Sequence, residues 1–169
     1  GDSPERTAAR PAERQSGVST SLPESGPPLQ VGDRPYAFTL EDLEGNTVQL
    51  ADFIGQPIMI NFWATWCGPC RIEMPEMQAA YEAYRDEGFV ILAVNQGETA
   101  AQVRQFYAEL GLTYPALLDL ESSVVQSYGT GNFLPSSLFI APNGEISAIH
   151  RGPLTRDQLA QYLEQTLPG

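Results

Sequence analysis

The feature that most constrains this chain is its one pair of cysteines, Cys67 and Cys70, which lie between an apolar run and an amphipathic run. Residues 58–63 have the length and composition of a buried strand, and residues 71–87 show the spacing of a helix. Cys67 should therefore lie near a helix N-terminus, where unsatisfied N–H groups favour the thiolate. Because the thiolate is the nucleophile and the second thiol can release the product, the pair indicates thiol–disulfide exchange.

Two other interpretations of the cysteines are weaker. A structural zinc site needs four ligands, and the sequence offers one histidine, His150, and no second cysteine pair. A purely structural disulfide would close a very short loop, which removes little chain entropy and stabilises weakly. An aromatic-flanked Cys-Gly-Pro-Cys between strand and helix fits redox chemistry better.

Composition limits the remaining classes of function. A length of 169 residues suits one domain, and a hydrophobic fraction of 42% is enough for a core. The formal net charge of −12 argues against a nucleic-acid partner, since phosphate binding needs a basic face. No apolar run approaches the ~18 residues of a membrane span, and no signal peptide is visible. We expect an anchor, if there is one, to lie upstream of this sequence.

Residues 1–30 differ in texture from the rest. They contain five Pro, five Ser and three Gly, and their apolar residues Val18, Leu22 and Leu29 are isolated. Such a segment cannot bury enough surface to offset its ordering entropy. We interpret it as a flexible tether, with a tail of no importance as the alternative, and place the folded domain at residues 31–169.

The pattern from Val31 onward predicts an α/β three-layer sandwich with a mixed sheet, because strands alternate with helices and one hairpin comes late. Residues 37–40 and 47–50 should form an N-terminal β-hairpin, and residues 137–140 and 146–149 a second one. The expected parallel strands are 58–63, 89–94 and 116–119, and the expected helices are 71–87, 99–110, 122–128 and 155–167.

With these elements in place, the chain resembles the TlpA/ResA-type thiol–disulfide oxidoreductases of the thioredoxin-like superfamily. Residues 61–70 resemble the active-site segment of that family, and Pro75 stands where thioredoxins carry a proline inside the helix. Residues 133–140 resemble the loop whose cis proline faces the disulfide. Residues 94–119 resemble the inserted helix and strand that separate this subgroup from plain thioredoxin.

Two positions depart from the related patterns. Asn61 replaces the buried aspartate of thioredoxin and cannot accept a proton, and Ser136-Ser137 replaces the usual Thr-Thr. Glu73, three residues after Cys70, matches a ResA-type glutamate. Residues i and i+3 share a helix face, so Glu73 could relay protons beside Cys70. The alternative is a solvated first-turn glutamate that pairs with the helix dipole.

The resemblance implies the roles of the site residues. Cys67 would attack a partner disulfide and Cys70 would resolve the mixed disulfide, with Glu73 assisting. Trp66, Gly68, Pro69, Leu134 and Pro135 would contact the substrate, with the Leu134–Pro135 bond cis. Trp66 should be exposed, whereas Trp63 should lie in the core.

The resemblance also implies the setting. We expect protein thiols and disulfides as partners, an upstream membrane dithiol donor, a monomer, and no cofactor beyond the redox-active disulfide. An extracytoplasmic, membrane-tethered bacterial protein that acts as a reductant, for example in cytochrome c maturation, is the expected context. Gly68 and Pro69 add no charge that would stabilise the thiolate, which favours the reducing direction.

Two alternative functions stay open on sequence alone. A redoxin-type thiol peroxidase would carry its attacking cysteine in a Thr-x-x-Cys context, which Thr65-Trp66-Cys67 does not supply. A copper-binding chaperone module would need a further His or Met ligand, and His150 is the one histidine. We expect no metal site.

Overall fold

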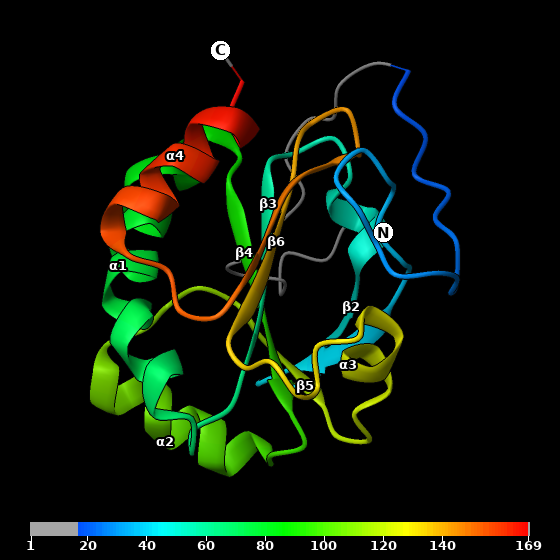
Figure 1. Ribbon diagram of the computed structural model, residues 1–169. Coiled ribbons are helices and arrows are strands. Elements are labelled where there is room, and N and C mark those ends of the chain that lie inside the picture. Colours follow the sequence, from blue (N-terminus) through cyan, green and yellow to red (C-terminus); the bar gives the residue numbers. More distant parts are fainter. Residues whose placement is uncertain (1–16, 169) are drawn as a thin grey trace.

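The computed structural model describes residues 17–168, which form three layers around one sheet (Figure 1). Helices α1 (Gly68–Tyr84), α2 (Ala100–Leu110) and α4 (Arg156–Thr166) cover one face. The opposite face is covered by the short helix α3 (Ser123–Tyr128), the 3-10 turn η1 (Leu50–Phe53) and the N-terminal segment. The predicted three-layer α/β architecture is confirmed. None of the helices in this described range is both long enough and apolar enough to cross a membrane.

The sheet has seven strands in the order β2-β1-β5-β4-β3-β6-β7. β3 pairs in parallel with β4, and β4 with β5, whereas the other neighbours are antiparallel. The sheet is therefore mixed, with β3 lying between a parallel and an antiparallel neighbour. The strands are β1 (Thr39–Asp42), β2 (Thr47–Gln49), β3 (Ile58–Trp63), β4 (Val90–Gln96), β5 (Ala116–Asp119), β6 (Ser136–Ile140) and β7 (Ile146–Arg151).

Strand β3 is buried on both faces, as its unbroken apolar run predicts. Met59 and Trp63 pack into the core under α1 and α2, whereas Ile58, Ile60 and Phe62 pack into the core on the α3 side. Successive side chains of a strand point to opposite faces, so one six-residue strand supplies both cores. The sheet face under α1 is also the face toward which the cysteines lie.

The boundary that matters most for the site differs from the prediction. Helix α1 begins at Gly68, not at residue 71, and Cys67 is its N-cap residue. Pro69 is accommodated in the first turn, where a missing N–H costs nothing. The regular helix ends at Tyr84, followed by a 3-10 turn (η2, Arg85–Glu87) and Gly88 in the left-handed region.

The N-terminal segment lies against the domain over the part that the structure describes. Val18, Leu22 and Leu29 pack on the core of the α3 side, and the Ala37 N–H donates to the Pro23 carbonyl at 2.8 Å. Apolar residues that are isolated in sequence thus find partners on a surface formed by the rest of the chain. Residues 17–30 are therefore packed on the domain and do not form the free tether that the sequence predicts. Residues 1–16 of the predicted tether lie outside the described range.

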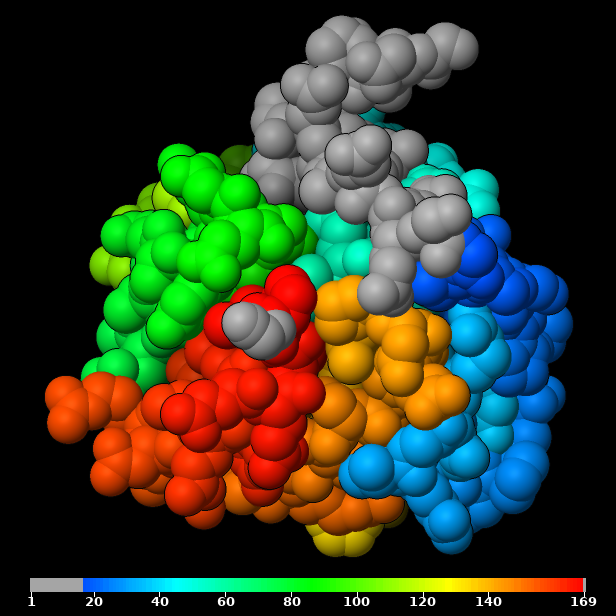
Figure 2. Space-filling view, turned by 90° about the horizontal axis from the view of Figure 1, so that it is seen from above, coloured from blue at the N-terminus to red at the C-terminus, as the bar shows by residue number. Residues whose placement is uncertain are grey.

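The chain that follows this segment is tied to the far end of the sequence. The Gly32 N–H donates to the Ile146 carbonyl at 2.9 Å, and the Ile146 N–H donates to the Asp33 carbonyl at 2.8 Å. In the view from above, the N-terminal part of the described chain (blue) accordingly lies beside the β6–β7 hairpin (orange), with α4 (red) on the other side of the hairpin (Figure 2). Residues 17–33 are therefore an integral part of the layer opposite α1.

Candidate active site

The cysteine pair lies where the strand β3 passes into helix α1. Cys67 and Cys70 form a disulfide with their Cα atoms 5.3 Å apart, and the Cys70 N–H donates to the Cys67 sulfur at 3.2 Å. Cys67 retains 5% exposure, whereas Cys70 has none. The predicted burial of Cys70 is confirmed, and the disulfide can be approached through Cys67.

The residues around Cys67 form an open surface. Trp66 is 68% exposed, and Gly68 and Pro69 are exposed as well. Trp63 is fully buried against Phe106, with ring centroids 5.1 Å apart. The contrast predicted between the two tryptophans is confirmed, because Trp63 belongs to the strand and Trp66 to the loop.

A second loop reaches the same end of β3. The Leu134–Pro135 peptide bond is cis, as predicted. Phe62 pairs with Ser136 across β3 and β6, so Pro135 lies beside the end of β3 from which the chain runs on to Cys67. The Pro135 carbonyl accepts from the Gly152 N–H at 2.7 Å, whereas within residues 17–168 no hydrogen bond engages the Leu134 backbone.

Glu73 is buried beneath the disulfide on the first turns of α1, with 1% exposure. One carboxylate oxygen accepts from the Leu154 N–H at 3.0 Å and the other from the Asn61 amide at 2.9 Å. Burial raises the pKa of Glu73 from 4.5 to about 7, although both hydrogen bonds act to lower it. The alternative of a solvated first-turn glutamate is wrong.

Asn61 connects Glu73 to strand β6. Its amide nitrogen donates both to Glu73 and to the Ser137 hydroxyl, the latter at 3.0 Å, and its carbonyl Oδ1 has no partner among the described residues. If Glu73 is protonated, a 180° turn of the Asn61 amide lets Oδ1 accept from both the carboxylic acid and the Ser137 hydroxyl. Asn61 therefore suits either protonation state of Glu73.

One residue of the site gives no signal in the sequence. Glu98, which follows β4 and is 8% exposed, accepts from the Thr65 N–H at 2.8 Å and the Thr65 hydroxyl at 2.5 Å. The Asn95 amide donates to the same carboxylate at 2.8 Å. This carboxylate thereby fixes the loop that leads into Cys67. A glutamate 33 residues away in sequence matches no motif, so only the packing identifies it.

His150, the one histidine, is engaged elsewhere, with ring nitrogens 3.0 Å from the Tyr162 hydroxyl and 3.1 Å from the Pro153 carbonyl. Over residues 17–168 there is no group of three or more His, Cys, Asp or Glu side chains able to hold a metal ion. The copper-chaperone alternative therefore gains no support from this arrangement.

An accessible disulfide at a helix N-terminus, a neighbouring cis proline and a buried carboxyl that titrates near neutrality define a thiol–disulfide oxidoreductase of the thioredoxin-like fold. Comparison with known proteins gives the family. Residues 31–149 match the AhpC/TSA family. The chain belongs to that family and, within it, to the ResA-type thiol–disulfide oxidoreductases.

Among the curated relatives, several carry the name thiol-disulfide oxidoreductase ResA, and two of them show the degree of similarity. The protein of Geobacillus thermodenitrificans is 41% identical over 140 residues, covering 83% of this chain and 80% of the relative. That of Oceanobacillus iheyensis is 43% identical over 143 residues, covering 82% and 74%. Among solved structures, a putative thiol:disulfide interchange protein DsbE from Chlorobium tepidum aligns with a TM-score of 0.74 at 30% identity, covering 80% and 96%. StoA from Bacillus subtilis aligns at 0.64 and 28% identity, covering 76% and 96%.

Proposed function

We propose that this thiol–disulfide oxidoreductase acts as a reductant of disulfides in partner proteins, with Cys67 as the attacking thiol. The observation that carries the proposal is the difference between the two cysteines. Cys67, the N-cap of α1, keeps 5% exposure, whereas Cys70, one turn further on, is fully buried. The helix N-terminus stabilises a thiolate at Cys67, whereas nothing outside the protein can reach Cys70 before Cys67 has reacted.

The exchange runs in two steps. The Cys67 thiolate attacks one sulfur of the partner disulfide, forming a mixed disulfide and releasing the partner's other sulfur as a thiolate. Cys70, as thiolate, then attacks the Cys67 sulfur, so that the Cys67–Cys70 disulfide forms and the second partner sulfur leaves reduced. Two electrons pass to the partner, and the proton of Cys70 needs an acceptor.

Glu73 would take that proton. It lies three residues after Cys70 on the same face of α1, and its pKa of about 7 lets it both accept and return a proton near neutrality. In the oxidised protein, Asn61 and Leu154 hold the carboxyl in place. Glu73 thus replaces, from the helix, the acid that thioredoxin carries at the position of Asn61.

The partner chain would be held beside the disulfide by the Leu134–Pro135 loop. The N–H and C=O of Leu134 are without partners in the described part of the chain and lie next to the end of β3. An extended segment can pair with them as an added strand. Trp66, Gly68 and Pro69 supply further exposed surface next to Cys67 in the chain.

Cysteine variants test the assignment of roles. Cys70→Ser should accumulate mixed disulfides between Cys67 and a partner, detected on non-reducing gels, because the resolving thiol is gone. Cys67→Ser should accumulate none, since Cys70 is buried. Equal trapping by both variants would refute the assignment.

The direction of transfer is tested by the reduction potential. Gly68 and Pro69 place no positive charge between the cysteines, and Glu73 disfavours a second negative charge beside them. The dithiol is therefore a strong electron donor, with a potential roughly at the thioredoxin end, near −270 mV, of the range that extends to −120 mV. Equilibration with dithiothreitol buffers measures it; a value near roughly −120 mV would reverse the direction.

We further propose that the protein works outside the bacterial cytoplasm as a membrane-tethered monomer. It would receive electrons from a membrane dithiol donor and supply them to a dedicated pathway such as cytochrome c maturation. The ResA relatives and the reducing character of the site support this setting. Deleting the gene and assaying covalent haem in c-type cytochromes tests the pathway: unchanged haem content would remove it.

A further inference from the structure

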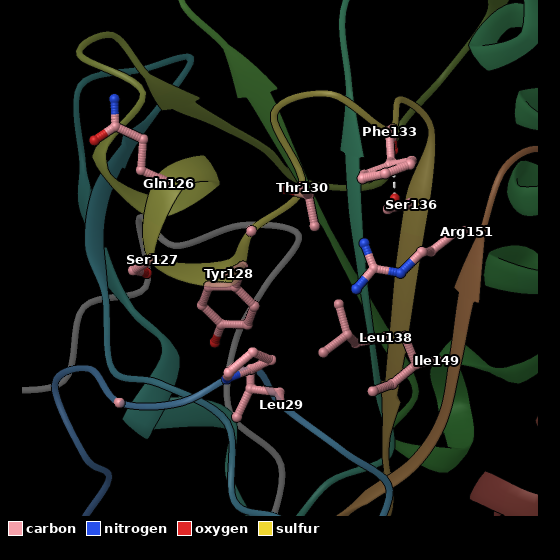
Figure 3. Close-up of a pocket in the computed structure, with 13 residues that line it drawn as sticks. Leu29, Gln126, Ser127, Tyr128, Thr130, Phe133, Ser136, Leu138, Ile149 and Arg151 are labelled. Atoms are coloured by element: carbon pink, nitrogen blue, oxygen red, sulfur yellow. Dashed lines mark hydrogen bonds between the residues drawn. The ribbon is translucent and has the colours of Figure 1, made fainter.

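A pocket of about 390 Å³ opens on the sheet face opposite α1, between α3, the first residues of β6, the end of β7 and the N-terminal segment (Figure 3). Its apolar walls come from Leu29, Tyr128, Phe133, Leu138 and Ile149, and one cation, Arg151, lies among them. We call it the Arg151 pocket. A cavity of this size can accommodate a large side chain of a partner protein.

Arg151 is an exposed residue at the end of β7, and its guanidinium packs on an aromatic ring. Its guanidinium lies 5.0 Å from the centroid of the Phe133 ring and reaches into the pocket between Phe133 and Leu138 (Figure 3). Among residues 17–168 no carboxylate pairs with it, although the chain carries 21 acidic residues. A guanidinium matches a carboxylate in a two-bonded geometry, so the pocket has an unused site for one.

The Arg151 pocket is continuous with the surface proposed to bind the partner chain. Phe133 and Ser136 line it, and they flank the Leu134–Pro135 bond whose unpaired backbone groups can hold an added strand. Leu134 itself packs against both cores, the one under α1 and the one on the α3 side. A strand added at Leu134 therefore runs along the boundary between the disulfide and the pocket.

The alternation of side chains along such a strand decides what enters the pocket. The Cys67–Cys70 disulfide belongs to the face under α1, whereas Tyr128 and Leu138 belong to the opposite face. When the reactive cysteine of the partner points toward Cys67, its immediate neighbour points to the other face, toward the Arg151 pocket. The residue two positions further along shares that face.

We propose that the Arg151 pocket selects partner proteins by the residues beside their reactive cysteine. The residue next to the cysteine carries a large apolar side chain, and the third residue from the cysteine on the same side carries a carboxylate. The apolar side chain packs against Tyr128, Leu138 and Ile149, and the carboxylate pairs with Arg151. The proposal rests on the proposed function, because it assumes that partner disulfides are exchanged at Cys67.

Disulfide-linked peptide dimers test the selection with the full chain in its reduced form. Four dimers carry Phe or Ser next to the cysteine, combined with Glu or Gln two residues further. Each combination is made on both sides of the cysteine, and released thiol peptide is quantified by chromatography. Hydroxyethyl disulfide, which is uncharged and too small to reach the pocket, reports the exchange chemistry alone.

The wild-type protein should reduce the Phe dimers about tenfold faster than the Ser dimers, on at least one side of the cysteine. Glu should add about threefold over Gln. Arg151→Gln should abolish the preference for Glu and leave the preference for Phe, whereas Arg156→Gln, an exposed arginine on α4, should change neither. Ile149→Trp, which fills the pocket from β7, should reduce the preference for Phe.

Different results would overturn the pocket proposal and the proposed function. Equal rates for all four dimers, or a Glu preference that survives Arg151→Gln, would overturn the pocket proposal while normal hydroxyethyl disulfide reduction leaves the proposed function standing. Inert behaviour toward every disulfide would overturn the proposed function itself. A pocket variant that changes the hydroxyethyl disulfide rate has altered the cysteine site. Leu29→Ala, on a wall of the pocket away from the Leu134 loop, then replaces it and should weaken the preference for Phe.

Discussion

Replacing Glu73 by glutamine should change how the stability of the oxidised protein depends on pH. The carboxyl is buried with a pKa of about 7, against 4.5 when it is free in the unfolded chain. Between these values the folded state binds one proton that the unfolded state has released. The free energy of unfolding therefore falls as the pH rises from about 4.5 to about 7. Below about pH 4.5 and above about pH 7, Glu73 contributes no further dependence on pH.

The size of the effect follows from the shift. A difference of roughly 2.5 pKa units corresponds to about 3 kcal/mol, at about 1.4 kcal/mol per unit. The glutamine that replaces Glu73 in this variant has no such titration. Its oxygen can accept from the Leu154 N–H, and its NH₂ group can donate to Asn61 Oδ1 once the Asn61 amide has turned. Glu73→Gln should fold, therefore, and lose only the pH-dependent component.

The assay is urea denaturation of the oxidised protein at pH values from 4.5 to 8.5, where the disulfide keeps the cysteines from titrating. The free energy of unfolding of Glu73→Gln, relative to that of the wild type, should rise by about 3 kcal/mol across this range. Glu76→Gln, which removes an exposed carboxylate from the same helix, should follow the wild-type trend. Parallel curves for wild type and Glu73→Gln would refute the burial argument.

Three further predictions concern stability. Glu98→Ala should lower the free energy of unfolding by about 2 kcal/mol in denaturant titrations, because it strips the acceptor from the Thr65 loop; a loss below about 0.5 kcal/mol, roughly a surface effect, would contradict this. Asn61→Asp places a second carboxyl beside Glu73, so the loss in free energy of unfolding, measured by denaturant titration, should be larger at pH 8 than at pH 4.5. An equal loss at both pH values would show that the two carboxyls do not interact. Thr155→Ala removes the side-chain cap of α4 and should cost about 1 kcal/mol; an unchanged unfolding midpoint would show the cap to be idle.

The order of elements around the cysteines can be predicted because it is a local property. The apolar run of β3, the polar-apolar spacing of α1 and the two residues between Cys67 and Cys70 are all contiguous in sequence. The spacing alone predicts a start of α1 that is three residues late, since Gly68 and Pro69 are weak helix formers in isolation. Their place in the first turn, capped by Cys67, removes that penalty.

The position of Glu73 shows where local reasoning ends. Spacing places Glu73 on the same helix face as Cys70 but leaves open whether that face meets solvent or protein. The Leu154 N–H, which lies 81 residues away between β7 and α4, closes over the carboxyl and decides the matter. The raised pKa is a consequence of that cover and not of the helix.

The packing of the N-terminal residues Val18, Leu22 and Leu29 also depends on parts of the chain that are distant in sequence. Val18, Leu22 and Leu29 are too few to form a core among themselves, and composition alone predicts a free tether. They pack against the domain because the rest of the chain presents an apolar surface, and Leu29 thereby becomes a wall of the Arg151 pocket.

The sequence by itself determined the cysteine pair, the elements that flank it, the cis-proline loop that the resemblance supplied, and hence the class of chemistry. The tertiary structure alone decided the burial of Glu73, the attachment of the Thr65 loop to Glu98 and the cavity beside Arg151. The physical reason is one of range: hydrophobic periodicity and capping act over a few residues, whereas desolvation and hydrogen-bond partners are set by segments that only the complete sheet brings together.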